Sequence, residues 1–191
     1  MNPRRVLITG AAGNLGSKLA AHLVGIGRSG NRQISDPCPI PELLRVPLQG
    51  SSITDEASLA LLDKPDGDLS VWDERWVSRF EGVDAVVHFA GDPVAYHDWD
   101  ELVAPNIDAV LNVFEAAARA GAKRLIFASS NHVMGGYQDG EPIPITTSLP
   151  PKPGLRYFAD GADRFSGAYA AAKLFGERLG QHYATTRGFL F

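Results

Sequence analysis

Residues 5–16 read RVLITGAAGNLG, and this stretch decides the fold class. A β-branched run ends at Gly10 and apolar residues at helical spacing begin after Asn14, which predicts a strand, a glycine turn and a helix. In parallel α/β sheets, such a turn brings backbone N–H groups and a helix N-terminus to the pyrophosphate of a dinucleotide. The glycines Gly10, Gly13 and Gly16 are spaced Gly-x-x-Gly-x-x-Gly and not Gly-x-Gly-x-x-Gly. A strand-to-helix turn that binds nothing therefore remains the alternative.

The composition excludes several classes of protein. The chain has 191 residues, of which 45% are hydrophobic and 21% charged, and its net charge of −4 is scattered, so we expect no nucleic-acid partner. Its single cysteine, Cys38, excludes an internal disulfide and argues against a metal cluster, so no metal site is expected. The apolar run at the N-terminus is too short for a signal peptide, and no run is long enough to span a membrane. We expect a cytoplasmic protein without a membrane partner.

Predicted strands and helices alternate along the chain, which favours a parallel sheet covered on both faces. The expected strands are residues 5–9, 32–36, 44–48, 83–88 and 123–128. The expected helices are residues 14–24, 54–62, 73–80, 98–120 and 167–187. Pro105 is expected to kink its helix or mark its start, and residues 135–154 are expected to form a loop. We therefore predict one α/β domain over residues 1–191, a Rossmann-type doubly wound parallel sheet with strand order 3-2-1-4-5.

Asp36 follows the second expected strand and favours NAD over NADP as the cofactor. Its carboxylate can accept hydrogen bonds from ribose hydroxyls and would repel a 2′-phosphate. No arginine stands at positions 11, 12 or 14 to bind such a phosphate. Because Asp36 lies further from Gly10 than the usual spacing of about 20 residues, a solvated turn aspartate before Pro37 remains the alternative.

Tyr169 and Lys173 are four positions apart, so a helix places them on one face. Tyrosine, with a pKa of about 10, is a poor base at neutral pH, and a nearby ammonium can lower that pKa by roughly 1–3 units. Ser129 and Ser130 end the preceding strand at the edge of the sheet where ligands bind. A serine hydroxyl there can hold a substrate oxygen while the tyrosine takes or gives a proton to accompany hydride transfer at nicotinamide. The pattern Tyr-x-x-x-Lys alone is common by chance. Its position after the glycine loop and the serine pair, in that order, is what supports a catalytic role.

With these motifs, the chain resembles the extended short-chain dehydrogenases, the NAD-dependent epimerase/dehydratase superfamily, over nearly its whole length. Two further blocks carry the resemblance, Gly67-Asp68-Leu69 and His88-Phe89-Ala90-Gly91. The resemblance implies that Asp68 and the backbone of Leu69 contact adenine and that the second block lines the cofactor, whereas His88 itself is interpreted as structural. It implies NAD contacts for Gly10, Gly13, Asn14, Leu15, Gly16, Asp36, Asp68, Leu69, Phe89, Ala90, Gly91, Asn106, Ser129, Tyr169 and Lys173. The implied catalytic residues are Ser130, Tyr169, Lys173 and Asn106, the last supporting the lysine through water.

Within the superfamily, the stretch SSNHV at residues 129–133 is most similar to uronate dehydrogenases, which oxidise the anomeric carbon of a hexuronic acid to a lactone. This resemblance implies substrate contacts for Ser130, Asn131, His132 and Tyr169. A turn-forming Asn131 and a surface His132 remain the alternatives.

The chain departs from the family at three places. Asp92-Pro93 stands where uronate dehydrogenases carry a serine, and residues 152–167 are longer than the family's link into Tyr-x-x-x-Lys. Arg156 and Arg164 in this segment either reach an anionic substrate or are surface arginines. Family members also continue into further strands and a small substrate-binding subdomain. We therefore expect a truncated chain with an unpaired sheet edge beside residues 123–128 and with weak cofactor binding and turnover.

Three functions remain open. The first is an NAD-dependent oxidoreductase acting on a sugar or sugar-acid hydroxyl with Tyr169 as general base, which Asn131 and His132 favour. The second is an NAD-dependent sugar-nucleotide epimerase or dehydratase, and the third is a truncated, non-catalytic NAD-binding protein. The expected partners are a small sugar substrate and a second copy of the chain, bound through the helices at 98–120 and 167–187.

Overall fold

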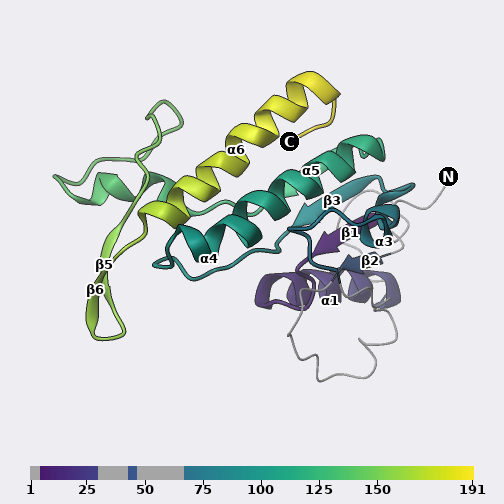
Figure 1. Cartoon of the computed structure of the whole chain (residues 1–191), viewed down its shortest axis with the longest axis horizontal. Coiled ribbons are helices and arrows are strands. Elements are labelled where there is room, and N and C mark those ends of the chain that lie inside the picture. The colour runs from purple at the N-terminus through teal and green to yellow at the C-terminus, as the bar shows by residue number, and fades with distance from the viewer. Residues whose placement is uncertain (1–4, 30–42, 47–66) are drawn as a thin grey trace.

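Four short parallel strands form the centre of the computed structural model, which describes residues 5–29, 43–46 and 67–191 (Figure 1). They are β1 (Val6–Thr9), β2 (Leu43–Val46), β3 (Ala85–His88) and β4 (Arg124–Phe127), in the order β2-β1-β3-β4. Val6 pairs with Ala85, and Ala85 in turn pairs with Arg124. The α/β class and the parallel sheet agree with the sequence prediction.

The position of β2 differs from the predicted strand order. The order 3-2-1-4-5 places residues 44–48 outside a strand at 32–36, whereas β2 pairs directly with β1, Val6 opposite Leu43. The expected strand at 32–36 and helix at 54–62 lie outside the described residues. The neighbours β1-β3-β4 match the predicted order 1-4-5. A short apolar run does not indicate which strand it pairs with in a sheet, because pairing depends on contacts between residues distant in sequence.

Helices flank the sheet on two sides. The helices are α1 (Asn14–Ser29), α3 (Glu74–Val77), α4 (Trp99–Val103), α5 (Ala109–Arg119) and α6 (Gly167–Arg187), and a 3₁₀ turn (Ser78–Phe80) continues α3. In Figure 1, α1 lies on one side of the strands, and α5 and α6 lie side by side on the other. These positions confirm the expected helices at 14–24, 73–80 and 167–187. A homodimer through α5 and α6 stays a prediction.

Alternating strand residues supply the two layers of the core. Leu7 and Val86 are completely buried in the cluster that packs against Phe114 of α5. Their neighbours Ile8 and Val87 face the other way and pack in a smaller cluster with residues of α1. Successive side chains of a strand point to opposite faces, so an unbroken apolar run serves both layers.

Pro105 lies in a π-helical turn, Ala104–Asp108, that joins α4 to α5. Proline has no N–H group and its ring clashes with the carbonyl four residues earlier, which a wider turn relieves. The expected irregularity at Pro105 is therefore present, and the helix continues through it. The turn brings Asn106 into the interior, where it is 2% exposed.

The C-terminal end of the chain pairs with β4. Gly188 ends α6 with a φ of 76°, and Leu190 forms a parallel bridge with Arg124. Leu190 donates to the carbonyl of Lys123 and accepts from the N–H of Leu125, both at 2.9 Å. The expectation of an unpaired edge is therefore wrong at the start of β4, because residues 189–191 return to it.

Two elements appear where the sequence analysis predicted neither a helix nor a strand. A 3₁₀ helix covers Asn131–Gln138, and an antiparallel hairpin is formed by β5 (Arg156–Ala159) and β6 (Ala162–Phe165). Figure 1 shows the hairpin projecting beside the N-terminal end of α6, away from the central sheet. In the part of the chain that the structure describes, no helix is long and apolar enough to cross a membrane.

Candidate functional site

The glycine loop between β1 and α1 is held by contacts that exclude larger side chains. Gly10 has a φ of 68°, and a Cβ there would lie 2.6 Å from the backbone nitrogen of Ala90. A Cβ on Gly16 would collide with the carbonyl oxygen of Gly10, which also accepts a 3.0 Å hydrogen bond from the N–H of Gly13. Two of the three glycines are therefore required by close backbone packing at the ends of β1 and β3.

The exposed part of this loop suits a pyrophosphate. Gly13, Asn14 and Leu15 are exposed where α1 begins, and the first turn of α1 carries no acidic residue. The partial positive charge of a helix N-terminus attracts an anion, and no carboxylate in that turn opposes it. The loop thus fits the pyrophosphate of NAD.

The block Gly67-Asp68-Leu69, which precedes α3, is anchored in the core through Leu69. Leu69 is buried in the main core, and its carbonyl accepts a 2.9 Å hydrogen bond from the side chain of Asn112 in α5. Asp68 is exposed, and its carboxylate accepts from the N–H of Ser70 at 2.9 Å and from its hydroxyl at 2.7 Å. Asp36, the other predicted adenosine contact, lies outside the described residues.

His88 at the end of β3 is completely buried and belongs to the scaffold of the site. Its Nδ1 lies 2.6 Å from the hydroxyl of Thr9, and its ring stacks on Phe127. Burial, with the nearby charge of Lys173, lowers the pKa of His88 to about 3. The imidazole is therefore neutral, in keeping with its interpretation as a structural residue.

Asn106 joins the helix after β3 to the loop that lines the site. Its Oδ1 accepts from the N–H of Asp92 at 2.8 Å, and its Nδ2 donates to the carbonyl of the same residue at 3.1 Å. A Cβ on Gly91 would lie 2.6 Å from that Oδ1, so the loop passes the amide closely. Both polar groups of Asn106 are engaged by the loop, and its expected support of Lys173 through water stays a prediction.

Lys173 lies on the inner face of α6 and is 8% exposed. Its Nζ donates a 3.0 Å hydrogen bond to the carbonyl of Ala128 and lies 5.6 Å from the centre of the Tyr169 ring. Burial lowers the pKa of Lys173 to about 8, so its charge is lost at mildly alkaline pH. The helix brings the lysine and the tyrosine together, as their spacing predicts.

Tyr169 is partly buried near the start of α6, and its ring contacts that of His132, whose backbone N–H donates to the Ser130 hydroxyl. Burial raises the pKa of Tyr169 above its ordinary value; the nearby Ser130 hydroxyl opposes this shift and the charge of Asp92 adds to it. The expected lowering of this pKa by Lys173 is therefore wrong for this structure. The reason is that burial disfavours the phenolate, while the ammonium is directed at the Ala128 carbonyl.

His132 contacts Tyr169, whereas Ser129 contacts Glu177. The His132 ring meets the Tyr169 ring edge-on, with 5.7 Å between the ring centres. Its Nδ1 is buried without a hydrogen-bond partner among the described residues, and burial lowers its pKa, so a neutral imidazole faces the tyrosine. Ser129 is turned to α6, where it donates a 2.5 Å hydrogen bond to Glu177.

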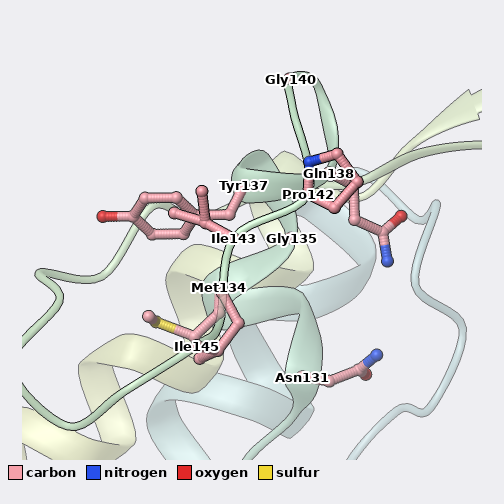
Figure 2. A pocket seen from close by; sticks show the side chains of 9 residues that line it. All are labelled: Asn131, Met134, Gly135, Tyr137, Gln138, Gly140, Pro142, Ile143 and Ile145. Atoms are coloured by element: carbon pink, nitrogen blue, oxygen red, sulfur yellow. The ribbon is translucent and has the colours of Figure 1, made fainter.

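Asn131 is exposed and lies at one end of a pocket with a volume of about 730 Å³, opposite Gly140 (Figure 2). The rest of the lining is largely apolar and comes from the 3₁₀ helix and the following loop: Met134, Gly135, Tyr137, Gln138, Pro142, Ile143 and Ile145. Asn131 and His132 are adjacent in sequence, yet one faces this pocket and the other faces Tyr169.

An ion pair in the loop after β3 is not predicted by any sequence motif. Asp92 lies 2.8 Å from Nδ1 of His97, and the other ring nitrogen lies 3.5 Å from Glu101. The hydrogen bond with Asp92 raises the pKa of His97 above its ordinary value. Asp92 stands where uronate dehydrogenases carry a serine, and its spacing to His97 matches no motif.

Comparison with known protein families matches residues 6–191 to the NAD dependent epimerase/dehydratase family. The NAD-dependent glucose-6-phosphate dehydrogenase of Haloferax volcanii is 33% identical over 181 residues, which cover 93% of this chain and 62% of that protein. The uronate dehydrogenase of Pseudomonas putida is 34% identical over 179 residues, covering 94% and 55%. A crystal structure of uronate dehydrogenase from Agrobacterium tumefaciens matches with a TM-score of 0.70 and 27% identity, covering 98% and 58%. The chain thus spans less than two thirds of these relatives.

Proposed function

This chain belongs to the NAD-dependent epimerase/dehydratase family, and we propose that it is an oxidoreductase that uses NAD to act on a hydroxyl group of a sugar or a sugar acid. The observation that carries the proposal is the pairing of Tyr169 with Lys173 on one face of α6, with the lysine Nζ 5.6 Å from the centre of the tyrosine ring, beside the strand end that carries Ser130. The similarity to an NAD-dependent glucose-6-phosphate dehydrogenase and to a uronate dehydrogenase supports the choice of substrate class.

The β1–α1 loop holds the cofactor in this proposal. The pyrophosphate meets the exposed backbone at Gly13, Asn14 and Leu15, and the tight packing at Gly10 and Gly16 keeps that backbone in place. The backbone at 89–91 lines the cofactor. NAD, when bound, supplies the hydride acceptor, and the protein supplies orientation and proton transfer.

The tyrosine hydroxyl takes the proton that leaves the sugar hydroxyl, and Ser130 holds the same oxygen by a hydrogen bond. Because burial holds the pKa of Tyr169 above its ordinary value, the reaction is expected to accelerate as the pH rises toward that pKa. Lys173 is protonated below a pH of about 8, and its positive charge then assists the proton transfer to Tyr169. Asn131 and His132 contact the sugar hydroxyls.

Nicotinamide absorbance in a mixture of the purified chain, NAD and a panel of sugars tests the proposal. Hexuronates, glucose 6-phosphate and arabinose form the panel, and net formation of NADH with one of them is the expected result. Tyr169→Phe is expected to lower that rate by about 10²–10⁴-fold while NAD still binds, because only the proton acceptor is removed. The matched control is Tyr183→Phe, whose hydroxyl donates to Glu115 on α5 and not to the site.

The outcomes separate the three functions. Conversion of a nucleotide sugar without net NADH would identify an epimerase or a dehydratase. NAD binding with no turnover of any sugar would identify a non-catalytic NAD-binding protein. Equal rates for the wild type and Tyr169→Phe would remove Tyr169 from the role of general base.

A further inference from the structure

The hairpin β5–β6 has an inner and an outer face. Tyr157 pairs with Arg164 across the two strands, and Arg156 pairs with Phe165. Phe158 and Phe165 are 72% and 52% exposed, whereas Tyr157 and Arg164 are both partly buried. Because successive residues of a strand face opposite sides, Tyr157 and Arg164 share the face that is turned to the protein.

The inner face meets the candidate site through Tyr157. The rings of Tyr157 and His132 meet edge-on, with 5.8 Å between their centres, and His132 meets Tyr169 in the same way at 5.7 Å. The three rings form one continuous contact from the hairpin to the tyrosine of the site. Arg164, the cross-strand partner of Tyr157, therefore lies on the same face of the hairpin as the ring that contacts His132.

The tip of the hairpin is attached to the loop after β3. Tyr96 of that loop donates a 2.9 Å hydrogen bond from its hydroxyl to the carboxylate of Asp160. The guanidinium of Arg164 lies over the Tyr96 ring, 4.4 Å from its centre. The hairpin thus contacts both the loop after β3 and the 3₁₀ helix that carries His132, and the guanidinium of its arginine lies against an aromatic face.

Arg164 has no ion-pair partner within 4.0 Å among the residues that the structure describes, and its Nε is buried without a hydrogen-bond partner among them. The carboxylate of Asp160 is already bound by Tyr96, and Asp92 is paired with His97. A buried donor without a partner is unfavourable, and it is often explained by a group that binds there. Arginine binds carboxylate and phosphate groups through two parallel N–H bonds, one of which can come from Nε.

We propose that the inner face of this hairpin forms an anion subsite, in which Arg164 binds the carboxylate or phosphate of an acidic sugar beside His132 and Tyr169. The inference rests on the proposed function, because it names the class of sugar that the same site takes. On this proposal, the hairpin before α6 is the element that selects acidic sugars over neutral ones.

Calorimetric titration of the purified chain with saturating NAD tests the subsite. The ligands are glucuronate for the carboxylate, glucose 6-phosphate for the phosphate, and glucose as the neutral sugar. The wild type is expected to bind at least one acidic sugar more tightly than glucose. Arg164→Gln is expected to weaken that binding by about tenfold or more and to leave glucose unchanged, since a charge-assisted pair is lost.

The matched control is Arg156→Gln, which removes the same charge from the outer face of the same hairpin, where the guanidinium lies 5.0 Å from the centre of the Phe165 ring. It is expected to bind the acidic sugar within about twofold of the wild type. Circular dichroism of each variant verifies that the fold is retained. Arg164→Lys, which keeps the positive charge, is expected to recover part of the affinity for the acidic sugar.

Three results would overturn the subsite: equal binding by the wild type and Arg164→Gln, an equal loss in Arg156→Gln, or no preference of the wild type for either acidic sugar. NADH formation, followed in parallel, keeps the two proposals separate. Turnover that is insensitive to Arg164→Gln refutes the subsite alone. Binding of an acidic sugar through Arg164 without turnover of any sugar refutes the oxidoreductase alone.

Discussion

The side chain of Asn106 makes two hydrogen bonds to the backbone of a single residue, Asp92, which lies 14 positions earlier in the chain. The π-helical turn around Pro105 places this amide in the interior beside the loop after β3. The same loop carries the Asp92–His97 pair and Tyr96, which contacts the hairpin. An irregular helical turn therefore sets the position of one wall of the candidate site.

Replacing Asn106 by alanine is expected to lower the free energy of unfolding by about 2–4 kcal/mol, because the N–H and the carbonyl of Asp92 lose their partner together. Urea unfolding followed by circular dichroism measures the change. Asn131→Ala is the control, since Asn131 is exposed, and its expected effect is below about 0.5 kcal/mol. A loss of the same size in both variants would contradict the anchoring role of Asn106.

Gly16→Ala is expected to destabilise the chain by about 1–3 kcal/mol and to weaken NAD binding, because the new Cβ collides with the carbonyl oxygen of Gly10. Thermal unfolding and a titration with NAD measure the two effects. Gly140→Ala provides the comparison, since a Cβ at Gly140 meets nothing within 4 Å. Unchanged NAD affinity in Gly16→Ala would show that the loop does not hold the cofactor.

The pH dependence of stability is expected to report the burial of Lys173. Its pKa is about 8 in the folded chain and 10.5 when unperturbed, so between these values the unfolded chain binds more protons. The free energy of unfolding therefore gains about 3 kcal/mol from this group as the pH rises through that window, and loses it as the pH falls. Unfolding curves at several pH values should show this rise in the wild type and not in Lys173→Met. Parallel curves for the two proteins would disprove it.

Acid is expected to destabilise the chain through His88, whose pKa is about 3 in the folded state against 6.5 when unperturbed. As the pH falls below 6.5, the unfolded chain takes up a proton that the folded chain does not, so stability is lost. Between about pH 7 and pH 4 this loss amounts to about 3 kcal/mol. The loss between these two pH values should be smaller in His88→Asn than in the wild type, and unchanged in a variant of the exposed His182.

The helices and the central strands could be predicted from local patterns. Apolar spacing and the glycine turn locate β1 and α1, and the alternation of elements predicts the parallel sheet that the structure contains. The placement of Lys173 beside Tyr169 also followed from sequence, because residues four positions apart share one face of a helix.

Other features could not be predicted because they depend on residues distant in sequence. The position of β2 next to β1 depends on which strands form hydrogen bonds with each other. The hairpin at 156–165 lies in a segment whose apolar and polar residues do not alternate clearly. The raised pKa of Tyr169 depends on how deeply its ring is buried, which its distance from Lys173 along the helix does not reveal.

The amino-acid sequence by itself determined the class of the fold, the glycine loop and the identity of the residues that could transfer a proton. Neighbouring residues are enough for these features, since helix periodicity and turn geometry act over a few positions. Only the tertiary structure decided which groups are charged and which side chains meet. Burial sets the charge of Lys173 and His88, and long-range packing brings Asn106 to Asp92 and the hairpin to His132.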